Sequence, residues 1–267
     1  MIKNWFVYPA YSNFSLIRTL ANREKEVSTN GTVLGGLWNF LLPLIQISIY
    51  TFVFAFVFKV RWGQTSVPTE SALKIFIGLS LFGLFAECVN AAPSLILYRR
   101  SFVTKLVFPL EILPYVTLWG ALRVLMLNLC LFAFFYYVCF GNIPWYLVIA
   151  FVLFLPVILY ALGLLWFLAS LGVFLRDIRN IVPVFVNILM FLSPIFYPAN
   201  MFPKNLAWLQ LLNPIGFLIE QARVAVFSPD ATLNWPAWGG LLLLGLCVSQ
   251  LGYVWFMKTK RGFADVL

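Results

Sequence analysis

The 267-residue chain offers few side chains for acid–base, nucleophilic or metal chemistry. It has no histidine, which excludes His-based triads and histidine metal sites, and Asp and Glu together number nine. No G-x-x-x-x-G-K-[ST] motif is present, so the chain lacks the loop that cradles nucleotide phosphates in ATPases. The paired acids of membrane glycosyltransferases are missing as well. We therefore expect no catalytic residue, no metal site and no cofactor on this chain, and ATP and Mg²⁺, if used, on a separate subunit.

Two charges lie inside otherwise apolar segments. Glu87 and Arg123 are each about 12 residues into consecutive predicted spans of opposite direction, so they are expected at similar depth. A pair would lower the cost of burying both charges. We interpret them as an intramembrane ion pair that locks two spans together, and direct contact with a substrate is the alternative. A proton- or sodium-coupled carrier usually shows more ionisable groups at this depth.

A third group of charges precedes a stretch with two prolines. Arg99, Arg100 and Lys105 come before Phe108-Pro109-Leu110-Glu111-Ile112-Leu113-Pro114, and an apolar run of about 25 residues follows. Two prolines five residues apart cannot both lie in the middle of one regular helix. Glu111 is expected near the start of the next helix, where the helix dipole and the nearby cations favour a carboxylate. A rigid bend of this kind, at the membrane surface, could pass force from a soluble partner into a membrane bundle.

The composition places these residues in a membrane protein. The chain is 63% hydrophobic and 10% charged, whereas a soluble domain carries about 25% charged residues. The net charge of +9 is more typical of cytoplasmic loops rich in Lys and Arg than of a nucleic-acid-binding protein. We therefore expect membrane lipids, and no nucleic acid, as partners.

The apolar runs predict an all-α integral membrane protein. About 20 apolar residues suffice to cross a bilayer, which gives six spans at about 35–58, 75–97, 112–139, 146–174, 181–198 and 235–257. Before them, residues 12–27 have the pattern of an amphipathic helix in the membrane interface, with a frayed polar tail as the alternative. Between the last two spans, residues 199–230 hold short apolar segments broken by prolines. We predict two short re-entrant helices there, with an ordinary extracytoplasmic loop as the alternative. Residues 1–267 are treated as a single domain.

The distribution of Lys and Arg orients the predicted spans. Six spans place both termini on one side, and most of the 18 Lys and Arg residues fall in the terminal segments, in 98–111 and in 176–179. The side richer in Lys and Arg is the cytoplasmic one. We therefore expect a multi-pass protein of the plasma membrane with both termini, and the 98–111 loop, in the cytoplasm.

Aromatic residues make up 18% of the chain, with 28 Phe, 11 Tyr and 10 Trp. Core packing and contact with lipid account for most of them. A more specific hypothesis is that some line a substrate path, because aromatic rings offer a flat apolar face on which a substrate can stack. The residues proposed for this path are Trp38, Tyr50, Phe54, Phe82, Phe85, Phe191, Phe196 and Tyr197.

Five motifs in one order carry a resemblance to a known family. Leu34-Gly35-Gly36-Leu37-Trp38 with Pro43-Leu44 begins the first span, and Phe108–Pro114 forms the F-P-x-E-I-L-P loop. Val173–Ile178 matches V-F-x-R-D-I, Ser193–Pro198 matches S-P-I-F-Y-P, and Asn213-Pro214 with Glu220 and Arg223 matches N-P…E-x-x-R. The chain resembles permease subunits of type-2 ABC exporters, and more narrowly those for O-antigen, teichoic acid and capsule polysaccharides. It departs from them before L-G, where the family often has a basic stretch and this chain has Glu24-Lys25-Glu26.

The resemblance implies partners and a function. It implies a homodimer of six-span subunits with two cytoplasmic ATPase subunits, which exports a lipid-linked polysaccharide across a bacterial inner membrane. Contact with the ATPase is expected at Arg99, Arg100, Lys105, Phe108, Pro109, Glu111, Arg176 and Asp177. The same fold serves drug, lipid and heme exporters, so a small-molecule or lipid exporter is the alternative. A membrane enzyme or secondary carrier is a third hypothesis.

Overall fold

The computed structural model describes residues 5–29, 35–57, 68–104, 108–142, 146–202, 205, 213–228 and 232–266. Within these ranges every regular element is a helix, and no strand occurs. Four helical stretches are long and apolar enough to cross a membrane: Thr69–Ser94, Leu110–Phe140, Leu147–Phe174 and Trp235–Val266. The expectation of an all-α chain with apolar, membrane-length helices is thereby confirmed for the described residues.

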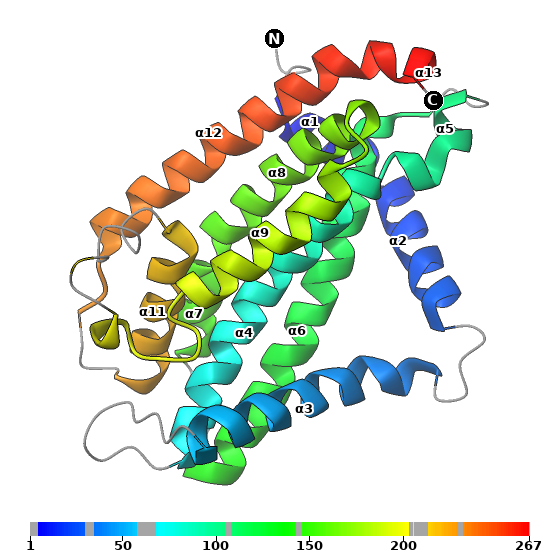
Figure 1. Cartoon of the computed structure of the whole chain (residues 1–267). Helices are drawn as coiled ribbons and strands as arrows, with labels where there is room; N and C mark the ends of the chain where they lie inside the picture. Colours follow the sequence, from blue (N-terminus) through cyan, green and yellow to red (C-terminus); the bar gives the residue numbers. More distant parts are fainter. Residues whose placement is uncertain are drawn as a thin grey trace.

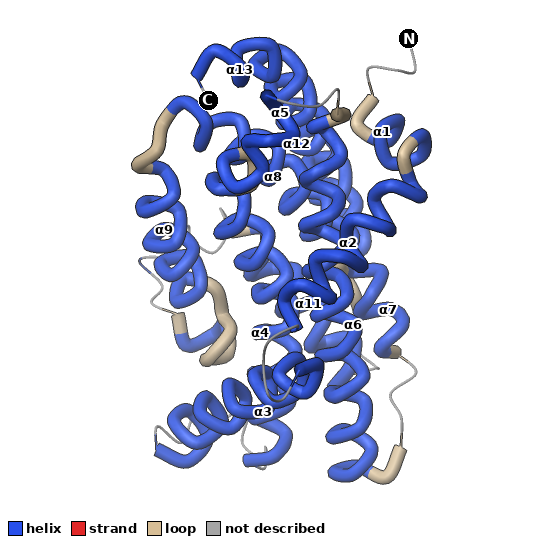
Figure 2. Tube along the Cα trace, turned by 90° about the vertical axis from the view of Figure 1, so that its right-hand side faces the viewer, coloured by secondary structure: helices blue, strands red, loops and turns tan. Residues whose placement is uncertain are grey.

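The long helices form a bundle. They are α4 (Pro68–Ala91), α6 (Leu113–Phe140), α8 (Leu155–Phe174), which continues the short α7 (Leu147–Leu153), and α12 (Trp235–Thr259). Helix α4 packs against α6 and α8, and α8 packs against α12. Figures 1 and 2 show these helices running alongside one another.

Two further apolar helices are shorter. Helix α9 (Ile178–Leu192) lies along the bundle beside α4 and α8. At about 1.5 Å per residue its 15 residues extend less than the hydrocarbon thickness of about 30 Å. Helix α3 (Trp38–Thr51) continues as a π-helix over Phe52–Val57 and crosses one end of the bundle at a steep angle in both views (Figures 1 and 2). The six-span count therefore stays a prediction.

Local sequence signals explain where several helices begin and end. The side-chain oxygen of Asn213 accepts a hydrogen bond from the Gly216 N–H at 3.1 Å and caps α11 (Pro214–Phe227). Asn234 caps α12 in the same way, through the Ala237 N–H at 3.1 Å. Helix α6 ends at Gly141, whose φ of 73° is the left-handed conformation that glycine adopts without strain.

The core is centred on α8. Trp166 is completely buried and packs edge-on against Tyr115 of α6 and Tyr253 of α12, with ring centroids 5.1 and 5.3 Å away. Phe6, just before α1 (Val7–Ser12), packs on the same indole at 6.3 Å. Trp166 therefore joins the N-terminal segment to two long helices.

Helices α8 and α12 approach closely through glycines. A Cβ atom on Gly163 would lie 2.6 Å from the carbonyl oxygen of Val248, and a Cβ on Gly252 would collide with the Gly163 backbone. Small residues allow such backbone contact between helices in a bilayer, where packing rather than hydrophobic burial drives association. Larger residues at these positions would force α12 away from the core.

The predicted N-terminal amphipathic helix is present as α2 (Phe14–Thr29). Its apolar face does not lie on lipid alone, because Ile17 and Ala21 are buried against Ile112 and Val116 at the start of α6. Arg18 is exposed on the other face. Helix α2 is thus a packed part of the fold at the end where α6 begins.

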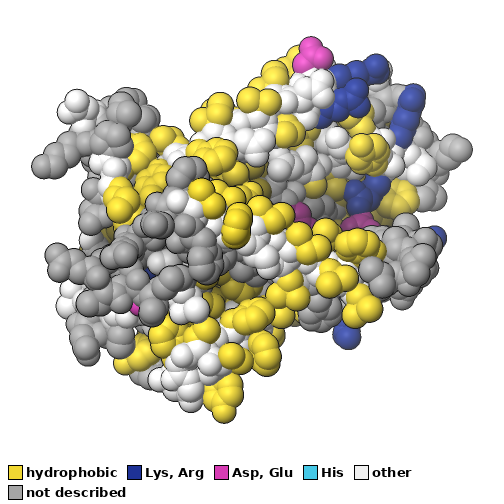
Figure 3. Space-filling model, turned by 60° about the horizontal axis from the view of Figure 1, so that its bottom comes forward, with side chains coloured by type: hydrophobic (Ala, Val, Ile, Leu, Met, Phe, Trp, Pro, Cys, Tyr) yellow, Lys and Arg dark blue, Asp and Glu magenta, His cyan; other side chains and the backbone are white. Residues whose placement is uncertain are grey.

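The two ends of the bundle differ in character. Helices α1, α5 (Arg100–Thr104) and α13 (Phe263–Val266) gather at one end with the α8–α9 turn, whereas α7 and α11 lie at the other (Figure 1). We call these the charged end and the opposite end. Figure 3 shows Lys and Arg side chains gathered towards one end of the molecule, and hydrophobic side chains spread over much of the described surface next to them.

Candidate functional site

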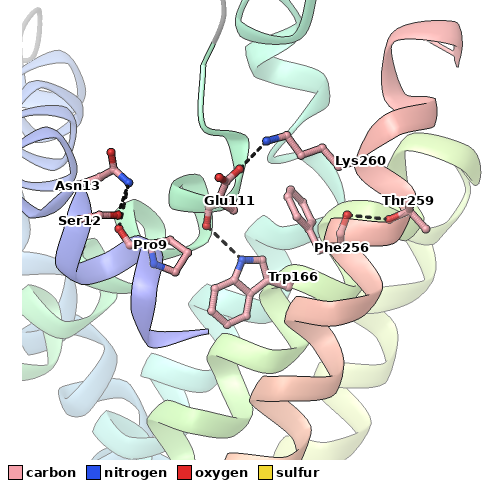
Figure 4. Close-up of polar contacts among 8 residues, drawn as sticks. All are labelled: Pro9, Ser12, Asn13, Glu111, Trp166, Phe256, Thr259 and Lys260. Carbon is pink, nitrogen blue, oxygen red and sulfur yellow. Dashed lines mark hydrogen bonds and ion pairs between the residues drawn. The ribbon is translucent and has the colours of Figure 1, made fainter. Parts of the chain in front are cut away.

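The double-proline stretch forms the bend that the sequence predicts. A 3₁₀ turn, η6 (Leu110–Ile112), follows Pro109 and leads directly into α6. The Glu111 carboxylate forms an ion pair with the Lys260 Nζ at 2.6 Å, and its backbone carbonyl accepts a hydrogen bond from the Trp166 indole N–H at 3.2 Å (Figure 4). Phe108 packs on Phe102 of α5, with ring centroids 4.6 Å apart. The bend is therefore fastened to α8, to α5 and to the segment after α12.

The partners of this bend differ from the expected ones. Arg99 forms an ion pair with Glu24 of α2 and donates to the Leu95 carbonyl at 3.3 Å, so it does not neutralise Glu111. Arg100 is exposed, and Lys105 lies outside the described residues. Arg99 therefore makes no direct contact with Glu111 in the favourable environment that the sequence predicts, because the packing of α2 on α6 brings Glu24 within its reach. Glu24 belongs to the acidic stretch that departs from the family pattern.

The segment after α12 is docked against the rest of the charged end. Thr259 shares a hydrogen bond of 2.6 Å with Ser170 of α8. Phe263 is completely buried, and its ring lies 5.5 Å from Phe256 and 5.9 Å from Phe174. Neither this contact nor the role of Lys260 was predicted from the sequence. The signal was present, since an aromatic residue follows the basic Lys258–Arg261 stretch.

The turn between α8 and α9 exposes Arg176 and Asp177. Both belong to the V-F-x-R-D-I motif, and Figure 1 places their turn near α5 and α13. Tyr98, just before α5, is 84% exposed. The charged end thus offers an exposed polar surface next to the fastened bend.

At the opposite end, Arg223 holds three carbonyl groups. It is 3% exposed and donates to the Lys74 carbonyl at 2.8 Å, to the Ile195 carbonyl at 2.6 Å and to the Pro194 carbonyl. Burial lowers the pKa of Arg223 to about 10, and the neighbouring Glu220 opposes that shift, so the guanidinium remains a cation at neutral pH. One side chain of α11 thereby joins α4 to the S-P-I-F-Y-P segment.

Asn213 adds a second tie to that segment. Its Nδ2 donates to the Ser193 Oγ at 2.8 Å, while its Oδ1 caps α11. The N-P…E-x-x-R and S-P-I-F-Y-P motifs therefore meet in space, although about 20 residues separate them. We call Arg223 and Asn213, with the backbone and side-chain groups that they bind, the clamp. Both residues were part of the family resemblance, but the clamp was not predicted from the sequence.

Several residues proposed for the substrate path lie next to the clamp. The Tyr50 ring is 5.0 Å from Phe196, and Phe196 is 5.7 Å from Phe191. The Tyr197 hydroxyl donates to the Phe191 carbonyl at 2.9 Å. Phe196 is buried and Phe191 is 59% exposed, so this aromatic cluster reaches from the core to the surface of α9.

Three other residues proposed for the path lie away from this aromatic cluster. Phe82 and Phe85 are buried in the core of α4 at 3% and 4% exposure, and Trp38 borders a cavity between α3, α4 and α6. The side chain of Phe54 lies outside the described part of the chain. The fold thus brings four of the eight residues together and places Trp38, Phe82 and Phe85 apart from that cluster.

Glu87 of α4 and Arg123 of α6 do not contact each other, and Glu87 is exposed. Arg123 donates to the Ala21 carbonyl at 2.6 Å and to the Asn22 side chain at 3.4 Å. No ion pair joins Glu87 to Arg123 within the described ranges, where four other pairs are found. The predicted ion pair is therefore not a contact in this structure, because α2 packs on α6 and presents its own acceptors to the guanidinium.

The described residues contain no cluster of His, Cys, Asp and Glu that could hold a metal ion.

The chain matches the ABC-2 type transporter family over residues 15–227. It is 25% identical over 256 residues to an O-antigen export system permease protein RfbA of Klebsiella pneumoniae, with 95% of each chain covered. It is 28% identical over 233 residues to the protein of that name from Myxococcus xanthus, with 83% of this chain and 85% of that one covered. The chain therefore belongs to the ABC-2 type transporter family, as a multi-pass membrane permease whose nucleotide is bound by an ATPase partner.

Proposed function

We propose that this chain is the transmembrane subunit that exports a lipid-linked polysaccharide, such as an O-antigen precursor, across a bacterial inner membrane. ATP hydrolysis on two separate cytoplasmic subunits would drive the export. The observation that carries the proposal is the similarity over 95% of the chain to a relative named for O-antigen export. The five motifs that point to polysaccharide permeases favour the same substrate class.

The proposed topology has six spans and a homodimeric assembly. Helices α3 and α9 would supply the first and fifth spans, with both termini in the cytoplasm. Arg99, Arg100, Arg176 and the Lys258–Arg261 stretch lie at the charged end and support this orientation, because a cytoplasmic face is enriched in Lys and Arg. Residues 199–230 would then form the extracytoplasmic re-entrant segment, of which α11 is the described α-helix, and 206–212 lie outside the described residues.

Force would enter at the charged end. An ATPase that contacts α5 and the Arg176–Asp177 turn would move the bend that contains Glu111. The ion pairs of Glu111 with Lys260 and of Arg99 with Glu24 would pass that movement to α12 and α2. Because the bend leads without a break into α6, the displacement would continue along a 28-residue helix towards the opposite end.

The glycan would leave past the aromatic cluster at the opposite end. A polymer of many repeats must pass without being held tightly, and each stack of a sugar on an aromatic face is weak. Tyr50 and Phe191 supply such faces, and Arg223 fixes the segment that carries Phe196. Export of a small molecule or a lipid by the same fold is the alternative, because family membership alone does not determine the substrate.

Deletion and complementation test the proposal in cells. On deletion of the gene, the lipid-linked glycan is expected to accumulate on the cytoplasmic side and to disappear from the surface. Complementation by this chain together with its ATPase partner should restore surface glycan. Unchanged surface glycan in the deletion strain, with loss of a small-molecule or lipid efflux activity instead, would favour the alternative.

A further inference from the structure

A cavity of about 290 Å³ lies between α3, α4 and α6 and is not part of the aromatic cluster or of the charged end. Most of its wall is apolar, but one carboxylate and several other polar side chains open on it. Its lining residues are Trp38, Leu42, Pro43, Gln46, Phe76, Leu79, Ser80, Gly83, Leu84, Glu87, Val124, Leu125 and Asn128. A concave, mostly apolar pocket with a few convergent polar groups is the usual form of a small-ligand site.

The polar groups of this cavity are rich in acceptors. The Asn128 Oδ1 is buried and accepts no hydrogen bond from the described residues. The Ser80 hydroxyl donates to the Phe76 carbonyl at 2.9 Å, which leaves its oxygen lone pairs for another donor. Glu87 adds a carboxylate, and Gln46 adds an amide oxygen. A buried acceptor without a donor is unfavourable, so a ligand that donates hydrogen bonds would stabilise this site.

The charged groups around the cavity also favour a ligand that donates hydrogen bonds, and specifically a cation. None of the described residues that line the cavity is Lys or Arg. The nearby cation, Arg123, bonds instead to Ala21 and Asn22 of α2, and it forms no ion pair with Glu87 within the described ranges. A carboxylate in a low-dielectric surrounding is stable when a cation lies against it. The indole of Trp38 adds a π face that attracts a cation.

We propose that this cavity binds a primary ammonium group, with Glu87 as the counter-ion and Asn128 and Ser80 as hydrogen-bond acceptors. A membrane lipid with an amine headgroup or an amino sugar of a glycan would present this chemistry. The volume suits a headgroup or a single sugar ring and not an oligosaccharide. The proposal holds whichever substrate the transporter exports.

Thermal unfolding of the full-length protein with its ATPase partner tests this binding. In nanodiscs of phosphatidylglycerol, replacing part of the lipid with phosphatidylethanolamine should raise the unfolding midpoint, and phosphatidylcholine should do so less because its quaternary ammonium donates no hydrogen bond. In a second arm, glucosamine should raise the midpoint and the uncharged N-acetylglucosamine should not. A response in the first arm identifies the lipid as the source of the amine, and one in the second identifies the sugar.

Variants tie the effect to the cavity. Glu87→Gln keeps the shape of the side chain and removes its charge, so the apparent affinity for the responding amine should fall at least tenfold. The control is Glu70→Gln on the same helix, which removes a carboxylate that pairs with Lys74 outside the cavity. In Glu70→Gln, the amine should shift the unfolding midpoint as much as it does in the wild type.

Four results would overturn the proposal. The first three are no response to either amine, an equal response to phosphatidylcholine and phosphatidylethanolamine, and an unchanged response in Glu87→Gln. The fourth is a midpoint shift of the same size from NaCl alone, which would favour an alkali-metal site. The lipid comparison uses the wild-type protein, so the proposal can be refuted even if Glu87→Gln does not fold.

Discussion

Arg223→Met should loosen the opposite end of the bundle and reduce export. Methionine fills much of the volume of the arginine stem but cannot donate to the carbonyls of Lys74, Pro194 and Ile195. Each buried carbonyl left without a donor costs about 1–3 kcal/mol, and removal of the buried cation offsets part of the sum. Glu220 adds little to the cost, because its side chain is 33% exposed and solvent can reach it. We expect a net loss of about 3 kcal/mol of unfolding free energy.

Two further variants separate this clamp from a general effect of charge. Arg223→Lys keeps the positive charge but lacks the planar guanidinium, whose several N–H donors reach carbonyls in different directions. Its loss of unfolding free energy should therefore lie between those of the wild type and Arg223→Met. Arg18→Met removes an exposed charge from α2 and should stay within about 0.5 kcal/mol of the wild type. The assay is unfolding in micelles by denaturant titration, alongside surface glycan in complemented cells. Wild-type stability and export in Arg223→Met would refute the role of the clamp.

The remaining predictions address the charged end, the topology and the aromatic cluster. Glu111→Lys should uncouple ATP hydrolysis from export. Adding Lys260→Glu should restore part of the coupling, because the ion pair is re-formed with reversed charges. Absence of rescue would argue against a coupling role for this ion pair. Single cysteines at Ser101 and Asn205, in a background without the native cysteines, should react with an impermeant reagent from opposite sides, and labelling of both in intact cells would contradict the topology. Replacing Tyr50 and Phe54 together by Ala should slow export at unchanged expression and dimer assembly, whereas export that only tracks expression level would place these rings on lipid.

The sequence sufficed to predict the long helices because their signal is local. Apolar runs bounded by proline, glycine and charged turns gave 112–139 and 235–257, and the structure has helices at Leu113–Phe140 and Trp235–Thr259. The same kind of signal predicted the helix within 12–27. It did not give the tilt of α3, because the direction of a helix depends on its packing partners and not on its own composition.

The long-range polar contacts were beyond the reach of sequence patterns. Lys260 and Glu111 are 149 residues apart, and nothing in either local pattern pairs them. Arg223 was noticed as part of a motif, but its three carbonyl partners come from two other segments of the chain. The pairing of Glu87 with Arg123 was inferred from equal depth, and depth does not determine which acceptor a long guanidinium side chain reaches.

Reconstituted transport tests the central proposal most directly. The chain and its ATPase partner would be placed together in vesicles loaded with a lipid-linked polysaccharide, and accessibility of the glycan on the far side would be followed over time. We expect export that requires ATP, both subunits and the lipid-linked glycan. A complex that hydrolyses ATP with full activity yet moves a small molecule or an unglycosylated lipid, and leaves the polysaccharide in place, would contradict it.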